Sequence, residues 1–257
     1  MTEQEKPIAV WDSGVGGISV LRELLAIMPD ENYLYFGDSK NAPYGMKTKE
    51  EVCRISFTNI QYLLTLGIKA VVIACNTATG AAAKELRNAY PELPIIGIEP
   101  AIKPAALEKP NPTVIVMATP LALHQEKFEE LYRQYNKDAN ILLLPCPGLV
   151  ELIEQGKTEG EEIEDYLKKM LSPYRSAHPD SVVLGCTHYP HIKNEIAKVL
   201  GPEVAIFDGG AGTARETRRR LEASGLRNFS GKQGTVTILN SSGREDMIAL
   251  SKRLLYR

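Results

Sequence analysis

The sequence predicts an α/β fold built from two similar parallel-sheet units. Short apolar runs rich in Val and Ile alternate with helical patterns along the whole chain, which is typical of parallel strands joined by helices. Two of these runs end in a cysteine that is followed by small polar residues, and the runs at 7–12 and 113–118 resemble each other in residue type. A Pro-rich segment, residues 100–112, lies between the two halves and is the expected crossover.

Each expected strand is short, apolar and bounded by turn-forming residues, as buried strands usually are. In chain order, the expected strands cover residues 7–11, 33–36, 69–74, 94–98, 113–118, 141–144, 181–185, 204–207 and 235–239. The expected helices cover residues 17–28, 48–66, 77–90, 121–134, 148–155, 159–174, a segment that follows residue 185 and ends at 200, 211–223 and 243–254. This alternation predicts parallel sheets with helices on both faces.

We expect two pseudosymmetric domains that arose by internal duplication. Residues 1–98 together with 208–257 are predicted to form the first α/β domain, and residues 99–207 the second. Cys75 and Cys186 lie at comparable distances from the first strand of their units, which supports the duplication. Ligands of open α/β sheets bind outside the carboxyl ends of the strands. The active site is therefore expected in the cleft between the domains.

The composition is that of an ordinary soluble protein, with 44% hydrophobic residues, 24% charged residues and a net charge of -2. This charge gives no general attraction for nucleic acid or for an anionic membrane. No segment approaches the ~18 consecutive apolar residues of a membrane span, and the polar N-terminus lacks the apolar stretch of a secretory signal. We expect a cytoplasmic protein with no membrane and no nucleic-acid partner. Its four cysteines should stay reduced there, which favours catalytic or buried thiols over disulfides.

Cys75 and Cys186 are the strongest candidates for chemistry. Each ends a buried strand and is followed directly by small polar residues, Asn76-Thr77 after the first and Thr187-His188 after the second. Such side chains, with the amides of a helix start, bind the carboxylates of a small substrate and lower the pKa of a thiol. The imidazole pKa lies nearest physiological pH, so His188 is suited to passing protons to and from the cleft.

Two loops at strand ends are further candidates to line the cleft. The segment Asp12-Ser13-Gly14-Val15-Gly16-Gly17 opens a helix but lacks the glycine spacing of a dinucleotide-binding turn. Its free N–H groups favour an anion cradle with a functional Asp12, and the alternative is a tight turn capped by Ser13 or Asp12. Loop 37–45 mixes turn-forming residues with the hydroxyl of Tyr44, so it either lines the cleft or is a plain connection.

Other polar groups have competing interpretations. Glu151 lies on a helix near a strand end of the second unit, where its carboxylate either faces the cleft and assists His188 or stays in solvent. Cys53 and Cys146 fit small buried hydrophobic residues, because no polar helix-start residues follow them. Cys186, His188 and His191 do not have a standard zinc spacing, and no second ligand cluster appears, so no metal is expected.

Taken together, these motifs resemble the signature blocks of the glutamate racemase family. The matching blocks, in order, are residues 8–17, 35–39 with 43–45, 74–78 and 184–190, within a resemblance that spans about residues 6–221. The Asp-Ser-Gly-Val-Gly-Gly and Cys-Thr-His-Tyr-Pro segments resemble those of glutamate racemases more closely than those of other members of the aspartate/glutamate racemase superfamily. One difference is Asp208-Gly209-Gly210, where the family usually carries Asp-Ser.

The resemblance implies cofactor-independent interconversion of L- and D-glutamate for peptidoglycan synthesis, with no metal. It implies two-base proton transfer at Cα, in which Cys75 serves the D-glutamate face and Cys186 the L-glutamate face. Asp12 would assist Cys75, and His188, with Glu151, would assist Cys186. The substrate-binding residues implied by the match are Asp12, Ser13, Tyr44, Gly45, Asn76, Thr77, Thr187 and His188. A homodimer is also expected, because the family often forms one and homodimers are the commonest assembly.

Other functions stay open on the sequence alone. A racemase of the same superfamily could act on aspartate or a hydantoin instead. A Cys–His hydrolase needs only one nucleophilic cysteine and a base, which leaves the second cysteine unexplained. A redox protein would join Cys75 to Cys186, but a substrate between them implies a separation beyond the ~4.4–6.8 Å Cα spacing of a disulfide. A binding role toward DNA gyrase, attributed to some family members, is not addressed by the composition.

Overall fold

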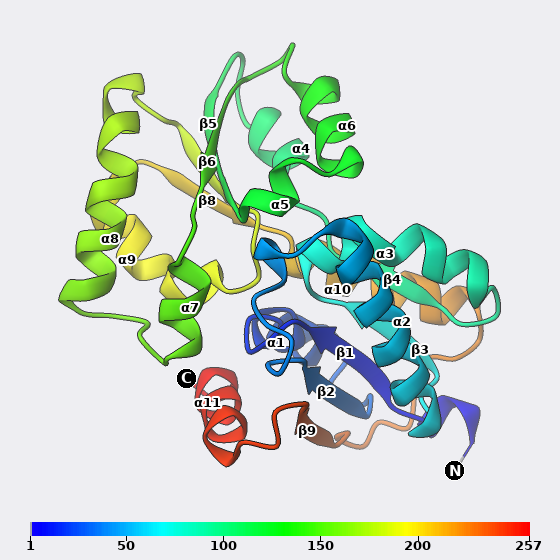
Figure 1. Cartoon of the computed structure of the whole chain (residues 1–257). Helices are drawn as coiled ribbons and strands as arrows, with labels where there is room; N and C mark the ends of the chain where they lie inside the picture. Colours follow the sequence, from blue (N-terminus) through cyan, green and yellow to red (C-terminus); the bar gives the residue numbers. More distant parts are fainter. Residues whose placement is uncertain (1) are drawn as a thin grey trace.

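Two parallel β-sheets form the framework of the protein (Figure 1). The computed structural model describes residues 2–257. The first sheet has the strand order β4-β3-β1-β2-β9, and the second has the order β6-β5-β7-β8. Every strand pairing in both sheets is parallel. The predicted α/β class with two parallel-sheet units is therefore confirmed.

The elements alternate along the chain as expected. The first sheet consists of β1 (Ile8–Asp12), β2 (Tyr33–Gly37), β3 (Ala70–Ile73), β4 (Ile95–Gly97) and β9 (Val236–Asn240). The second sheet consists of β5 (Thr113–Ala118), β6 (Asn140–Pro145), β7 (Ser181–Leu184) and β8 (Ala205–Asp208). The α-helices are α1 (Ile18–Ile27), α2 (Lys49–Thr65), α3 (Asn76–Ala89), α4 (Ile102–Ala106), α5 (Pro120–Leu123), α6 (Glu126–Tyr135), α7 (Leu149–Glu154), α8 (Glu161–Leu171), α9 (Lys193–Leu200), α10 (Gly210–Ala223) and α11 (Glu245–Leu255). Within residues 2–257, no helix combines the length and the apolar character needed to cross a bilayer.

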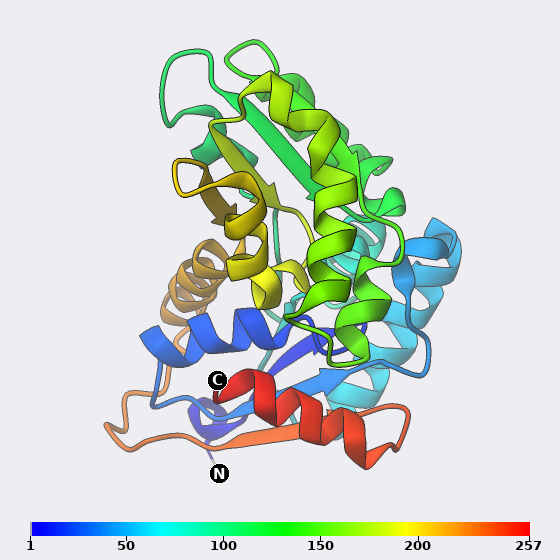
Figure 2. The same cartoon turned by 90° about the vertical axis from the view of Figure 1, so that its left-hand side faces the viewer.

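Both faces of each sheet are buried, because successive side chains of a strand point to opposite faces and both faces carry helices. In β1, Ile8 and Val10 belong to a core shared with α1, α10 and α11. Ala9 and Trp11 belong to a separate core shared with α2 and α3. The second sheet is covered by α7, α8 and α9 on one side and by α4 and α6 on the other. Figure 2 shows α1 and α11 side by side over the first sheet.

The predicted helix over residues 121–134 is wrong in one respect, because it is two helices. The first, α5, ends at Leu123, and α6 begins at Glu126. Thr119 caps α5 by accepting a hydrogen bond from the backbone N–H of Ala122. Gln125 lies at the break between the two helices, and its side chain donates to the backbone carbonyl of Thr77 in α3.

Two other segments differ from the predicted elements. The Pro-rich crossover contains a short helix, α4, which Ile102 and Ala105 anchor in the core of the second unit. The helix expected directly after Cys186 starts later, as α9. A 3₁₀ turn, Tyr189–Ile192, comes first, with Pro190 near its start.

Two connections join the sheets, and they touch each other. One follows β4 and the other follows β8, and a Cβ placed on Gly209 would lie 2.3 Å from the carbonyl oxygen of Glu99. A glycine at position 209 therefore allows the two connections to meet backbone to backbone. The chain then returns to the first sheet, where β9 pairs with β2.

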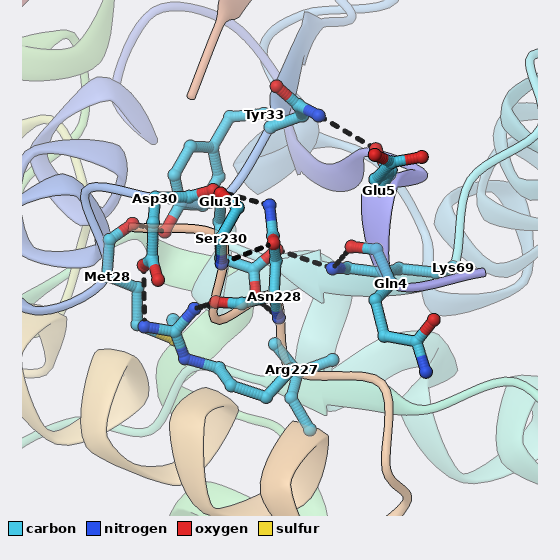
Figure 3. A network of polar contacts seen from close by, with 12 residues as sticks. Gln4, Glu5, Met28, Asp30, Glu31, Tyr33, Lys69, Arg227, Asn228 and Ser230 are labelled. Atoms are coloured by element: carbon cyan, nitrogen blue, oxygen red, sulfur yellow. Dashed lines mark hydrogen bonds and ion pairs between the residues drawn. The ribbon is translucent and has the colours of Figure 1, made fainter. Parts of the chain in front are cut away.

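A buried cluster of charges holds this returning segment against the first sheet (Figure 3). Glu31 and Lys69 form an ion pair in which both side chains are fully buried. Glu31 also accepts from Arg227 Nη1 at 3.0 Å and from the backbone N–H of Asn228 at 2.8 Å. Arg227 reaches Asp30 through its other terminal nitrogen at 2.7 Å. Because these residues precede β2, β3 and β9, the cluster lies at the amino ends of the strands.

Replacing Glu31 by Gln should destabilise the protein by about 3 kcal/mol, because it leaves the buried Lys69 charge without its carboxylate and removes one of the two carboxylates that Arg227 contacts. Urea unfolding followed by circular dichroism measures this change. Glu129→Gln is the matched control, since the Glu129–Arg133 pair is exposed and should contribute less than about 1 kcal/mol. Equal urea midpoints for Glu31→Gln and Glu129→Gln would show that the buried cluster does not anchor the fold.

Candidate active site

One narrow cavity lies between the two sheets, beyond the carboxyl ends of their strands, and measures about 30 Å³. It is lined by every predicted site residue except Asp12, namely Ser13, Tyr44, Gly45, Cys75, Asn76, Thr77, Glu151, Cys186, Thr187 and His188. These side chains follow β1, β2, β3, β6 and β7, so both units contribute. A larger cavity of about 840 Å³ lies between α7 and α11, but neither thiol lines it. We therefore identify the narrow cavity as the candidate site.

Cys75 is the N-cap residue of α3, which begins at Asn76, one residue earlier than expected. Its Sγ accepts from the backbone N–H of Ala78 at 3.4 Å and lies 3.6 Å from Ser13 Oγ. Burial and the nearby Asp12 carboxylate raise the pKa of Cys75 to about 12, against the opposing effect of these hydrogen bonds. The helix-start donor lowers this pKa as expected, but the net shift is upward because desolvation of the thiolate outweighs it.

Cys186 has a different environment from Cys75. It follows β7, and no α-helix begins at this point, so the expected second helix start is absent from this loop. Its Sγ instead lies 3.6 Å from His188 Nδ1. The two thiols thus have similar positions in their units but different neighbours: Cys75 has a backbone N–H donor and a serine hydroxyl that accepts from it, and Cys186 has an imidazole.

His188 is held by Glu154 and not by Glu151. His188 Nε2 lies 2.6 Å from Glu154 Oε1, while Glu151, one turn earlier on α7, lines the cavity without a hydrogen bond to the imidazole. Burial alone would lower the pKa of His188, but the hydrogen bonds to Cys186 and Glu154 and the charges of these groups raise it well above its usual value. Of the two alternatives left open for Glu151, its carboxylate faces the cleft, but the docking of α7 presents the last residue of the helix, Glu154, to the imidazole.

The glycine-rich turn after β1 receives a carboxylate, and this carboxylate belongs to the protein itself. The backbone N–H of Val15 donates to Glu154 Oε1 at 2.7 Å. A Cβ on Gly14 would lie 1.9 Å from the same oxygen, and a Cβ on Gly16 would lie 2.4 Å from His188 Nδ1. Glycines are therefore needed at both positions for the second unit to approach the turn this closely.

Asp12 lies beneath the cavity and joins the two units. Its Oδ1 accepts from the backbone N–H of Gly14 at 2.9 Å, and its Oδ2 accepts from Thr187 Oγ1 at 2.9 Å. Asp12 is fully buried, and this burial raises its pKa despite the charge of His188. It acts on Cys75 through its charge, since no hydrogen bond joins the two side chains among the described residues.

The hydroxyl of Tyr44 does not face the cavity as a free group. It donates to Asp38 Oδ2 at 2.5 Å and accepts from Asn59 Nδ2 at 3.0 Å. Asn41 also donates to Asp38. Tyr44 and Gly45 both line the cavity. If they contact the substrate as predicted, they do so through atoms other than the Tyr44 hydroxyl.

Asn76 and Thr77 occupy the first turn of α3. Asn76 Oδ1 is buried and has no hydrogen-bond partner within residues 2–257, which leaves an acceptor beside the cavity. Thr77 Oγ1 lies 3.0 Å from Thr119 Oγ1 of the second unit. An unpartnered buried acceptor is costly, so Asn76 is suited to accept from a ligand group.

Three residues at the site were not predicted to take part. Glu154 could have been proposed on the same grounds as Glu151, because both are carboxylates on α7, the helix that faces the cavity. For Thr119, the only signal in the sequence was its position directly after β5. This position in the second unit is equivalent to that of Ser13, which follows β1 in the first unit. Cys146 was predicted to be a buried hydrophobic residue, and it is buried and lines the cavity, with Sγ 3.4 Å from the Leu144 carbonyl oxygen. In the part of the chain that the structure describes, no three His, Cys, Asp or Glu groups gather as a metal site.

The fold and the cavity define a class of protein: an α/β enzyme of two similar parallel-sheet units with a thiol from each unit in the cleft between them. The family model described as Asp/Glu/Hydantoin racemase matches residues 17–217. A glutamate racemase of Clostridium botulinum (strain Alaska E43) is 50% identical over 255 residues, which cover 99% of each chain. One of Clostridium perfringens (strain ATCC 13124) is 51% identical over 97% of this chain and 96% of that protein.

Solved structures agree with these relatives. Glutamate racemase of Francisella tularensis in complex with D-glutamate superposes with a TM-score of 0.85 at 27% identity, covering 99% of this chain and 95% of the other. The Escherichia coli enzyme in complex with L-glutamate and the activator UDP-MurNAc-ala gives a TM-score of 0.84 at 31% identity, covering 97% and 95%. The chain belongs to the Asp/Glu/Hydantoin racemase family.

Proposed function

We propose that the protein interconverts L- and D-glutamate without a cofactor, by moving a proton between the two faces of Cα. The observation that carries this proposal is a pair of buried thiols in the same narrow cavity, Cys75 at the end of a strand of one sheet and Cys186 at the end of a strand of the other. Relatives of about half identical sequence are glutamate racemases, and two structural neighbours hold D-glutamate and L-glutamate. Racemisation removes a proton from one face and returns one to the other, and a thiolate base facing a thiol acid can do both.

The surroundings of the thiols favour one starting arrangement. His188, whose pKa is raised, carries a positive charge, and its Nδ1 lies 3.6 Å from Cys186 Sγ. Cys75, whose pKa is raised, keeps its proton. With L-glutamate bound, the Cys186 thiolate takes the Cα proton and the Cys75 thiol gives its proton to the opposite face. The thiols have then exchanged roles, which is the arrangement that converts D-glutamate.

Donors and acceptors around the cavity suit an amino-acid substrate. The free Asn76 Oδ1 would accept from the substrate ammonium, and the hydroxyl of Ser13 would donate to a substrate carboxylate. A donor aimed at the charge that develops in the transition state is worth about 3 kcal/mol in enzymes. Because the cavity is narrow and both units line it, we expect the units to separate to admit the substrate and to close around it.

The proposed function includes a biological role for the product. D-glutamate formed in this way would supply peptidoglycan synthesis, as the family resemblance implies. We expect the enzyme to act in the cytoplasm as a homodimer.

A circular dichroism assay of the purified protein with L-glutamate tests the proposal. The optical signal should decay to zero as the two enantiomers reach equal amounts, without any added cofactor. L-aspartate, assayed in parallel, should lose its signal roughly 10- to 200-fold more slowly, since one methylene in a well-fitted site is worth about 1–3 kcal/mol. Faster racemisation of aspartate would assign the protein to a different substrate, and no racemisation of either would refute the proposal.

A further inference from the structure

Gln125 of the second unit reaches across the cleft to the first unit. It lies at the break between α5 and α6, and only 6% of the residue is exposed. Its Nε2 donates to the backbone carbonyl oxygen of Thr77 at 2.9 Å. This carbonyl belongs to the first turn of α3, the helix that begins directly after Cys75.

Thr77 is thus held from the second unit at two points. Thr119 Oγ1 lies 3.0 Å from the Thr77 hydroxyl, and Gln125 binds the Thr77 carbonyl. The adjacent residue Ala78 supplies the backbone N–H that contacts Cys75 Sγ at 3.4 Å. A shift of this turn would therefore move both a cavity-lining hydroxyl and the donor on the thiol.

The interior of α3 makes room for Gln125 with a glycine. A Cβ on Gly80 would lie 1.8 Å from Gln125 Oε1 and 2.6 Å from Gln125 Cδ. Glycine is a poor residue for the interior of a helix compared with alanine. The absence of a side chain at position 80 therefore gives space to Gln125 at some expense to the helix itself.

We propose that Gln125 is a positioning residue for racemisation, which acts through Thr77 on the first turn of α3. The Cys75 side of the site then reaches its working geometry only when the second unit is docked against it. Gln125 does not line the cavity between the thiols, so it acts without contacting the substrate. The inference rests on the proposed racemase function, since its readout is the rate of that reaction.

Two substitutions on different elements break the same contact. Gln125→Ala removes the donor. Gly80→Ala keeps Gln125 but displaces the flexible end of its side chain. The new Cβ at position 80 would also lie 3.3 Å from Gln125 Cβ, so Gln125 Cβ must move by a few tenths of an ångström. Since alanine favours the helix, Gly80→Ala should fold at least as well as the unchanged protein. Gly212→Ala in α10 is the matched control, because its Cβ would meet only the Arg215 guanidinium at 3.9 Å.

The expected result is a fall in kcat/KM of about threefold to tenfold for each single variant, the size of one lost hydrogen bond. KM should rise more than kcat falls, because the displaced turn carries Asn76 and Thr77. The double variant should be no slower than either single variant, since both act on one contact. Gly212→Ala should keep the unchanged kinetics, and all variants should keep their thermal unfolding midpoints within a few degrees.

Two outcomes would overturn the inference. One is a Gly80→Ala enzyme with unchanged kinetics. The other is a double variant whose loss is the product of the two single losses, which would mean that the residues act independently. An unchanged protein that racemises neither enantiomer would instead refute the proposed function, so the two failures are distinguishable.

Discussion

Replacing Cys75 or Cys186 by serine should lower the rate of glutamate racemisation on the order of 10³-fold or more, while the fold is kept. A hydroxyl is far less acidic than a thiol, so it cannot serve as the base at either face, and general acid–base groups contribute roughly 10²- to 10⁴-fold each. The two losses should be of similar size, because every turnover needs a base on one face and an acid on the other. Circular dichroism of glutamate measures the rate, and the unfolding midpoint of each variant checks the fold.

The control for these variants is another cysteine. Cys53 lies on α2, half-buried and away from the cavity, so Cys53→Ser should keep the unchanged rate. A hydrolase with one nucleophilic cysteine would lose activity with only one of Cys75 and Cys186. Nearly normal turnover by either serine variant would be incompatible with two thiol bases.

Replacing Glu154 by Gln should lower kcat/KM by roughly tenfold near neutral pH and move the alkaline limb of its pH profile to lower pH. The Glu154 carboxylate raises the pKa of His188, so the imidazole keeps its proton to a higher pH than it would without this partner. Without that charge, the folded-state pKa of His188 falls and the proton is lost at lower pH. A charge-assisted hydrogen bond is worth about 1.5–3 kcal/mol, which corresponds to about a tenfold change or more.

Glutamine is suited to this test because its amide oxygen can still accept from the Val15 N–H, so the contact between the units is kept. Glu151→Gln, one turn earlier on the same helix, is the matched comparison. Because Glu151 has no hydrogen bond to His188 among the described residues, its variant should leave the alkaline limb in place. A larger alkaline shift for Glu151→Gln than for Glu154→Gln would reverse the assignment made from the geometry.

The equal free energies of the two enantiomers constrain how any variant can behave. L- and D-glutamate are equally stable in water, so the ratio of kcat/KM for the two directions equals one for every variant. Loss of a group beside Cys186 therefore lowers kcat/KM equally in both directions. Differences between Cys75 and Cys186, whose surroundings differ, can appear only in kcat and KM separately or in isotope exchange.

The sequence predicts the fold well because the signals for strands and helices are local. Each strand is an apolar run ended by turn residues, and helix starts such as Thr48 and Thr119 carry capping side chains. The break at Gln125 could not be predicted in this way. Its cause is a hydrogen bond to Thr77, a residue of the other unit far away in the sequence.

The site residues were predictable as a set, but their partners were not. Cys75 follows a buried strand and caps a helix, which local reasoning reaches, yet its pKa depends on burial by the second unit. Glu151 and Glu154 lie one turn apart on α7, and only the docking of that helix decides which of them meets His188. The Tyr44 hydroxyl is held by Asp38 and by Asn59 of α2, a contact that no motif reveals.

The most direct test of two thiols acting on opposite faces is the conversion of L-glutamate in deuterated water, analysed by mass spectrometry before the reaction has gone far. D-glutamate formed early should carry deuterium at Cα, because Cys75 delivers a proton exchanged with solvent, while the remaining L-glutamate should still carry protium. A D-glutamate product that retains the original proton of L-glutamate would mean that one group carries the proton across, and would contradict the assignment of one base to each face.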